Sequence, residues 1–213
     1  MIVQSHTPEQ VVQEALSDLP AMWNKMKEPL GRLQRKLRKD KSLRMVPRLF
    51  PYRSHAGNNW FVVVLPTKKV LNIVPFVWYR GVDGFYRAAR IMEDGVCYHI
   101  SHHVLDQYNV RFNRTVDGYT RMKEFLRENM NFGTEYREDN GEVRVGVTHG
   151  YMIGAWVVPN RIVQLITYVD HGRLGEDQLL QMDRLDEQRA SALRPVRPAG
   201  RKPPPWDLPR PAA

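Results

Sequence analysis

The chain of 213 residues lacks the features that mark secreted and membrane proteins. It has a single cysteine, Cys97, which excludes an intramolecular disulfide and fits a reducing compartment. Its longest apolar runs, WFVVVLP and AWVVP, have the length of strands and fall far short of a membrane span. The opening segment MIVQSHTPEQ has no basic region, apolar stretch or cleavage site of a secretion signal. We therefore expect a cytoplasmic protein with no membrane span.

Motifs of several common enzyme classes are also missing. The chain contains no H-E-x-x-H zinc motif, P-loop, G-x-S-x-G elbow or dinucleotide-binding glycine pattern. We accordingly expect no cofactor and no metal. An alternative metal site would combine Cys97 and His99, on one face of an expected strand, with His102 or His103 and with His149 as a fourth ligand. A lone cysteine on an apolar strand is, however, usually a core residue.

Positive charge is concentrated in one segment. The net charge is +9, and residues 25–53 hold eleven Lys and Arg against two acidic residues, so this segment accounts for the whole excess. Such confinement indicates a surface that faces RNA or another polyanion. A solvated helix face is the alternative.

Residues 1–45 are interpreted as a helical, basic N-terminal extension. Thr7-Pro8-Glu9-Gln10 has the pattern of a helix start, and we expect this first helix to end near Leu19, before Pro20. A second helical stretch, restarted at Pro29, carries an apolar stripe, which we expect to dock on the protein's own core with its basic side outward. The stripe consists of Met22, Met26, Leu30, Leu33 and Leu37. The basic residues around it, our candidates for nucleic-acid binding, are Arg32, Arg35, Lys36, Arg38 and Lys39.

Residues 46–194 are expected to form an α+β domain, with an antiparallel sheet and packed helices. Period-two patterns predict strands at residues 48–54, 60–67, 72–81, 84–92, 96–100, 142–149, 151–158 and 161–169. Helices are expected at residues 102–113, 118–130 and 175–193. Residues 195–213 contain seven prolines and are expected to form a disordered tail, in which residues 203–209 around Trp206 are a candidate docking element for a protein partner.

The segment YHISHHVLDQYNVRF, residues 98–112, carries the densest set of chemically active side chains. Ser101 is a plausible helix N-cap, and Val104, Tyr108 and Phe112 follow at helical spacing as a core-facing stripe, with Leu105 beside them. His103, Gln107 and Arg111 repeat that spacing one residue earlier, about 100° around the helix. An imidazole, an amide and a guanidinium are therefore expected along one edge of a buried face.

This segment resembles the RelE/BrnT-like small toxin superfamily and related uncharacterised bacterial proteins over residues 97–170. In those relatives a helix of the form H-x-x-x-R-x-x-x-R precedes a three-stranded antiparallel sheet. The matching residues here are His103, Gln107 and Arg111, followed by strands that carry Thr148-His149-Gly150 and the sequence ITYV. Gln107 stands where the pattern has its first arginine, so one positive charge is missing. The resemblance implies cleavage of RNA without a metal.

Such cleavage needs a base for the 2′-hydroxyl, a cation for the developing phosphorane charge and an acid for the leaving oxygen. His103 is the candidate base, Arg111 the phosphate clamp, and His149 or Tyr168 the acid. Gln107 is a candidate contact to the nucleic acid. The alternatives are a solvated His103 with an Arg111 that covers the core with its stem, or non-catalytic anion binding.

Aromatic residues interleaved with basic ones on the expected strands offer stacking surfaces for nucleobases, although packing in the core is the more common role. They are Trp60, Trp78, Tyr79, Phe85, Tyr86 and Trp156. The sequence thus predicts an RNA-binding protein that is a candidate metal-independent endoribonuclease. The alternative is a non-enzymatic adaptor that binds partners through its basic helix and its proline-rich tail.

Overall fold

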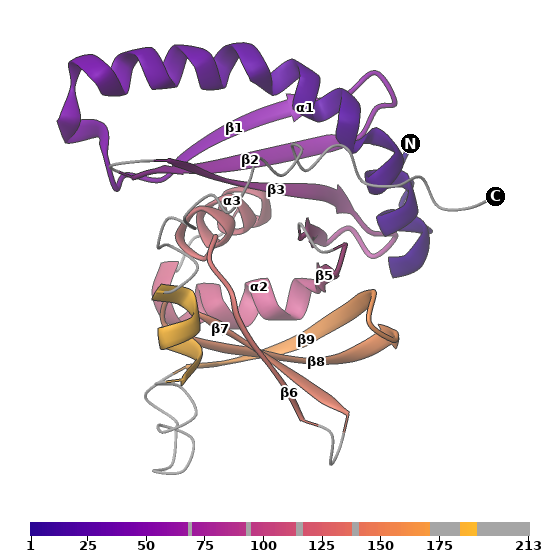
Figure 1. Ribbon diagram of the computed structural model, residues 1–213. Helices are drawn as coiled ribbons and strands as arrows, with labels where there is room; N and C mark the ends of the chain where they lie inside the picture. Colours follow the sequence, from indigo (N-terminus) through magenta and orange to yellow (C-terminus); the bar gives the residue numbers. More distant parts are fainter. Residues whose placement is uncertain (68–69, 93–94, 114–116, 138–140, 171–183, 191–213) are drawn as a thin grey trace.

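The structure, a computed structural model, describes residues 1–67, 70–92, 95–113, 117–137, 141–170 and 184–190. The expected tail 195–213 and its docking element lie outside these residues. Of the helix expected at residues 175–193, the described residues 184–190 are helical. The α+β class is confirmed, because helices pack on both faces of one nine-stranded, mostly antiparallel sheet (Figure 1).

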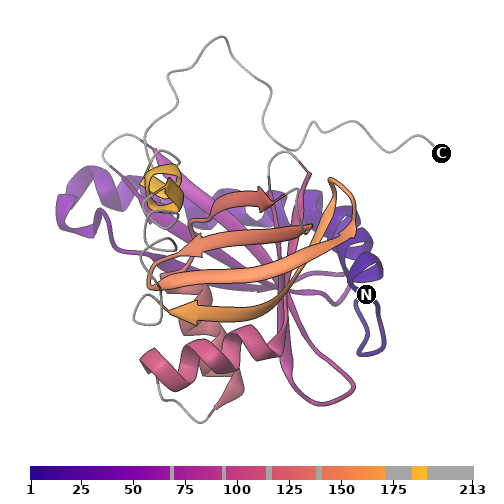
Figure 2. The same cartoon turned by 90° about the horizontal axis from the view of Figure 1, so that it is seen from below.

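The sheet consists of two antiparallel meanders. The first contains β1 (Arg48–Arg53), β2 (Asn59–Pro66), β3 (Leu71–Arg80), β4 (Tyr86–Ile91) and β5 (Cys97–Ile100). The second contains β6 (Gly133–Arg137), β7 (Glu142–Val147), β8 (Gly150–Val158) and β9 (Ile162–Asp170). The strand order is β1-β2-β3-β4-β5-β9-β8-β7-β6, and only the pair β5–β9 is parallel. Figure 2 shows the second meander running obliquely across the first.

Helices α2 (His102–Tyr108) and α3 (Gly118–Glu128) form the connection between the meanders. They lie in the space that the two meanders enclose (Figure 1). Val104, Tyr108, Met122 and Phe125 on these helices are buried there against both meanders. The connection thus supplies the inner core around which the sheet bends.

Helix α1 (Pro8–Lys39) covers the outer face of the first meander (Figure 1). It starts as expected, with a capping box between Thr7 and Gln10. The expected break was wrong: α1 is one helix of 32 residues that contains both Pro20 and Pro29. An interior proline removes one backbone hydrogen bond, but burial of an apolar face along the whole helix compensates. That face is Val11, Val12, Ala15, Leu19, Met22, Met26 and Leu33.

The long apolar strand β2 is buried on both faces. Phe61 and Val63 point into the inner core, whereas Trp60 and Val62 point toward α1. This double burial explains why the run WFVVVL lacks polar alternation. Within the described residues, no helix is both long enough and apolar enough to cross a membrane.

Two local elements differ from the sequence-based expectation. The α-helical part of the expected helix 102–113 ends at Tyr108 and continues as a π turn, Asn109–Asn113. The wider π turn changes the helical phase, so Phe112 is 41% exposed instead of buried. Strand β6 was not predicted, because its short sequence GTEYR has little apolar character. This segment is a strand because it pairs with β7.

Candidate functional site

The structure brings three of the four predicted catalytic residues together. The Nη1 of Arg111 donates to the backbone oxygen of Tyr168 at 3.1 Å, and its Nε forms an ion pair with Asp170 at 2.8 Å. The ring of His149 stacks on Phe112, with 4.7 Å between the ring centroids. Phe112 in turn contacts the ring of Tyr168. Arg111, His149 and Tyr168 therefore belong to one cluster at the π turn.

Two members of this cluster are poorly suited to catalysis. The charge of Arg111 is balanced by Asp170, so the guanidinium is already committed to a protein carboxylate. The hydroxyl of Tyr168 is buried and has no hydrogen-bond partner among the described residues. Burial raises the pKa of Tyr168 well above its usual value, so the hydroxyl keeps its proton. His149 is the exposed member of the cluster.

His103 lies apart from these residues. It is exposed at the start of α2, and Gln107 is half-buried one turn further along. In the described part of the chain, no hydrogen bond, ion pair or ring contact joins His103 to Arg111, His149 or Tyr168. Arg111 lies eight residues further along, in the π turn, and its guanidinium is bonded to Tyr168 and Asp170. Ribonuclease activity stays a prediction.

The ribonuclease hypothesis predicts a large effect of His103→Ala. If His103 is the base, the variant should cleave labelled single-stranded RNA about 100- to 10,000-fold more slowly than the wild type in EDTA-containing buffer. His55→Ala is the matched control, because His55 is exposed on a different loop. Equal cleavage rates, or no cleavage by the wild type, would contradict the hypothesis.

The residues of the alternative metal site have different surroundings. Cys97 is buried under α1, and its thiol donates to the backbone oxygen of Gly95 at 3.7 Å. His99 contacts Tyr79, and His102 stacks on Phe85. Among the described residues, no three His, Cys, Asp or Glu side chains are placed to hold a metal ion.

A pocket of about 340 Å³ lies beside α2 and was not predicted as a site. It is bounded by the turn between β3 and β4 and by the first turns of α2 and α3. Its lining residues are Arg80, Gly84, Phe85, Tyr86, His102, Leu105, Asp106, Asp117, Gly118 and Arg121. Of these residues, Phe85, Tyr86, His102 and Leu105 were named from the sequence for other reasons, whereas both arginines and both aspartates were missed.

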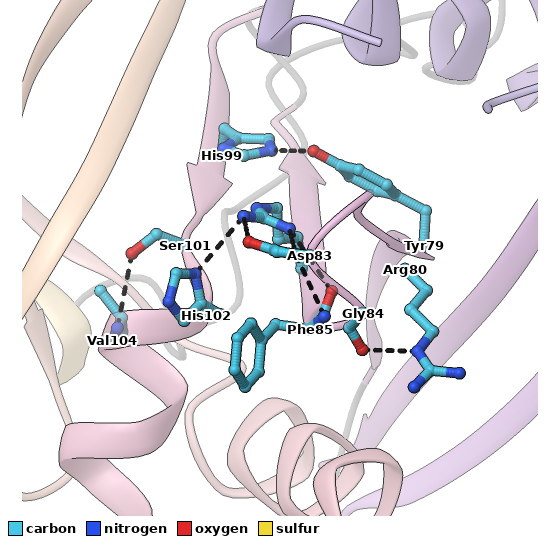
Figure 3. A network of polar contacts seen from close by, with 10 residues as sticks. Tyr79, Arg80, Asp83, Gly84, Phe85, His99, Ser101, His102 and Val104 are labelled. Carbon is cyan, nitrogen blue, oxygen red and sulfur yellow. Dashed lines mark hydrogen bonds and ion pairs between the residues drawn. The ribbon is translucent and has the colours of Figure 1, made fainter. Parts of the chain in front are cut away.

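The β3–β4 turn is held by a network of polar contacts (Figure 3). The Nε of Arg80 donates to the backbone oxygen of Gly84 at 2.5 Å, and Gly84 has a positive φ of 80° that favours glycine. Asp83 accepts the backbone N–H of Phe85 at 3.1 Å and two bonds from Arg87, at 2.8 and 2.5 Å. The hydrogen bonds from Arg87 hold the pKa of the Asp83 carboxyl well below its usual range.

This network places Phe85 at the mouth of the pocket. Phe85 is 49% exposed, and one face of its ring stacks on His102, with 4.8 Å between centroids and 14° between planes. The Nη2 of Arg87 lies 3.4 Å from the Nδ1 of His102. Because a guanidinium only donates, Nδ1 accepts, and in the neutral ring the proton is on Nε2. Arg87 therefore orients the His102 ring, on which Phe85 stacks.

The other aromatic candidates are mostly structural. Trp60 and Tyr79 are buried, while Trp78, Tyr86 and Trp156 are partly buried and pack against the inner core. The packing role is therefore observed for these five, and Phe85 differs from them.

A carboxylate balances one arginine of the pocket. Arg121 forms an ion pair with Asp106 across the space between α2 and α3. Asp117 caps α3 and accepts the backbone N–H of Thr120 at 2.7 Å. Arg80 is exposed, and among the described residues it forms no ion pair. The pocket thus offers both donors and acceptors.

A second candidate surface is the exposed side of the C-terminal part of α1. It consists of Arg32, Arg35, Lys36, Arg38 and Lys39, and we call it the α1 basic face. The apolar positions of the same segment are turned toward the sheet: Leu33 is buried, and Leu30 and Leu37 pack against the outer core. The expected docking, with the basic side outward, is observed.

No family model, curated protein or solved structure matches the chain, so its function must be argued from its own residues.

Proposed function

We propose that this protein binds RNA through the α1 basic face. The observation that carries the proposal is the exposure of five cations within eight residues on a helix that the protein's own core holds in place. In the described residues, Arg32 has an acidic partner, the exposed Glu28 at 3.4 Å, whereas the other four cations form no ion pair. When Lys and Arg side chains neutralise phosphates, the counterions condensed on the nucleic acid are released, which drives binding.

The cytoplasm is the compartment that fits this proposal, because it contains RNA and keeps Cys97 reduced. Cations at the end of a helix also stabilise that helix through its dipole. The adaptor alternative uses the same face to bind an acidic protein surface. The two functions differ in their ligand and in the dependence of binding on salt.

Removing charges from the α1 basic face should weaken RNA binding and flatten its salt dependence. We would combine Arg32→Gln, Arg35→Gln, Arg38→Gln and Lys39→Gln. Each lost phosphate contact reduces the slope of log K against log salt by about 0.7 for a single strand, so the slope should fall by up to about 3 units. Fluorescence anisotropy with a labelled 12-nucleotide RNA at several salt concentrations measures this slope.

The control is a variant with four exposed cations replaced elsewhere: Lys123→Gln, Arg127→Gln, Arg161→Gln and Arg184→Gln. It has the same net charge as the test variant, so a general loss of positive charge affects both equally. We expect the control to retain most of the wild-type slope. Equal slopes for the two variants would contradict the proposal. Wild-type binding to an acidic peptide but not to RNA would favour the adaptor.

A further inference from the structure

We propose that the pocket beside α2 holds one unpaired base of the bound RNA, stacked on the open face of Phe85. This inference rests on the proposed function, because it names the part of the RNA that a second site recognises. Bases in single-stranded RNA are commonly bound by stacking on an aromatic side chain and by hydrogen bonds to their edges. The pocket provides both kinds of contact.

Phe85 is suited to be the stacking platform. A large apolar side chain that is half exposed gains by being covered, and its ring already stacks on His102 without a ligand. His102 covers one ring face, Asp83 holds the backbone N–H of Phe85, and Arg87 bonds both Asp83 and His102. A base on the other face would extend the stack of Phe85 on His102 by one ring.

The polar lining favours a base over a phosphate. Arg80 can donate from its terminal nitrogens while its Nε remains bonded to Gly84. Asp106 and Asp117 add acceptors, and these carboxylates would repel a phosphate group in the pocket. Base edges carry both donors and acceptors, which matches this mixture. The volume of about 340 Å³ is at the small end of the range for ligand pockets, as a single base requires.

The pocket and the α1 basic face lie toward opposite ends of β3. Arg80, which lines the pocket, is the last residue of β3. The start of β3 lies near the end of α1: Leu71 pairs with Pro66, and the backbone oxygen of Pro66 accepts the N–H of Met45, six residues after α1 ends. Ten residues of strand span roughly 33 Å. Contacts at the two sites should therefore contribute independently, and an oligonucleotide rather than a mononucleotide is needed to reach both.

The test is Phe85→Ala in the full chain, with a single-stranded 12-nucleotide RNA and an abasic oligomer of the same backbone. Loss of one stacked base should weaken binding of the RNA about 5- to 150-fold, while the salt slope and the affinity for the abasic oligomer stay unchanged. Phe85→Trp should retain binding. Val82→Ala is the matched control, because Val82 is 75% exposed on the same turn. An unchanged melting temperature confirms that Phe85→Ala folds.

The outcomes separate this inference from the proposed function. Equal RNA affinities of the wild type and Phe85→Ala would overturn the base pocket and leave the α1 basic face untouched. An equal loss on the abasic oligomer would also overturn it, because no base is then involved. A third outcome is that Phe85→Ala binds RNA more weakly, while the quadruple glutamine variant of the α1 basic face keeps the wild-type salt slope. This outcome would support the pocket and overturn the proposed function. Wild-type protein that binds neither oligomer would overturn both.

Discussion

Replacing Asp18 with alanine is expected to lower the free energy of unfolding by about 3–5 kcal/mol, and the melting temperature by roughly 10 °C. Asp18 is buried on α1, and its Oδ2 accepts bonds from the Nδ2 of Asn58 at 3.0 Å and the Nε1 of Trp60 at 2.8 Å. Each hydrogen bond to a charged group contributes about 1.5–3 kcal/mol, and alanine would leave both donors buried without their acceptor. Urea denaturation and thermal unfolding measure the loss.

The effect should extend to the N-terminal residues. The Oδ1 of Asn58 accepts the backbone N–H of Ile2 at 2.7 Å, so Asp18 also orients the side chain that holds Ile2. Glu14→Ala is the control, because Glu14 lies one turn earlier on the same helix and forms only a surface ion pair, with the N-terminal amine at 2.6 Å. We expect the control to change stability by less than about 1 kcal/mol. Similar losses in the two variants would mean that the buried network does not anchor α1.

Protonation of His99 should make the protein less stable at acidic pH. Burial and, to a smaller extent, nearby Arg87 lower the pKa of His99 to about 4, whereas a hydrogen bond with Gln164 and the charge of Glu9 act in the opposite direction. In the unfolded chain the pKa is about 6.5, so the unfolded state takes up the proton first as the pH falls. The stability that neutral His99 provides is therefore complete above pH 6.5 and is lost progressively down to pH 4. The loss should reach about 3 kcal/mol at pH 4.

The measurement compares the wild type with His99→Gln by urea denaturation between pH 7 and pH 4. Glutamine keeps a polar group near the Tyr79 hydroxyl, which lies 2.6 Å from the Nε2 of His99, but it does not titrate. Carboxyl groups titrate in both proteins, so the difference between the two curves isolates His99. His55→Gln, at an exposed position, should leave the wild-type curve unchanged. Parallel curves for the wild type and His99→Gln would show that His99 is not the group responsible.

Local signals in the sequence determined where most elements begin and which side chains they bury. The Thr7 and Ser101 caps start α1 and α2 as expected, because a cap satisfies backbone donors within three residues of itself. Alternating apolar residues, or a continuous apolar run in the case of β2, located eight of the nine strands, because side-chain direction in a strand depends only on position. The amphipathic pattern of α1 was enough to predict that its basic residues face outward.

The tertiary structure decided what depends on contacts between distant segments. The continuity of α1 through Pro20 and Pro29 depends on the sheet beneath it, and β6 depends on its pairing with β7. Arg111 is positioned by Asp170, 59 residues later in the chain, which no helical spacing indicates. The pocket beside α2 likewise combines a turn and two helix starts that only the path between the meanders brings together. Sequence patterns report the environment of each residue along one element, whereas a site is defined by which elements meet.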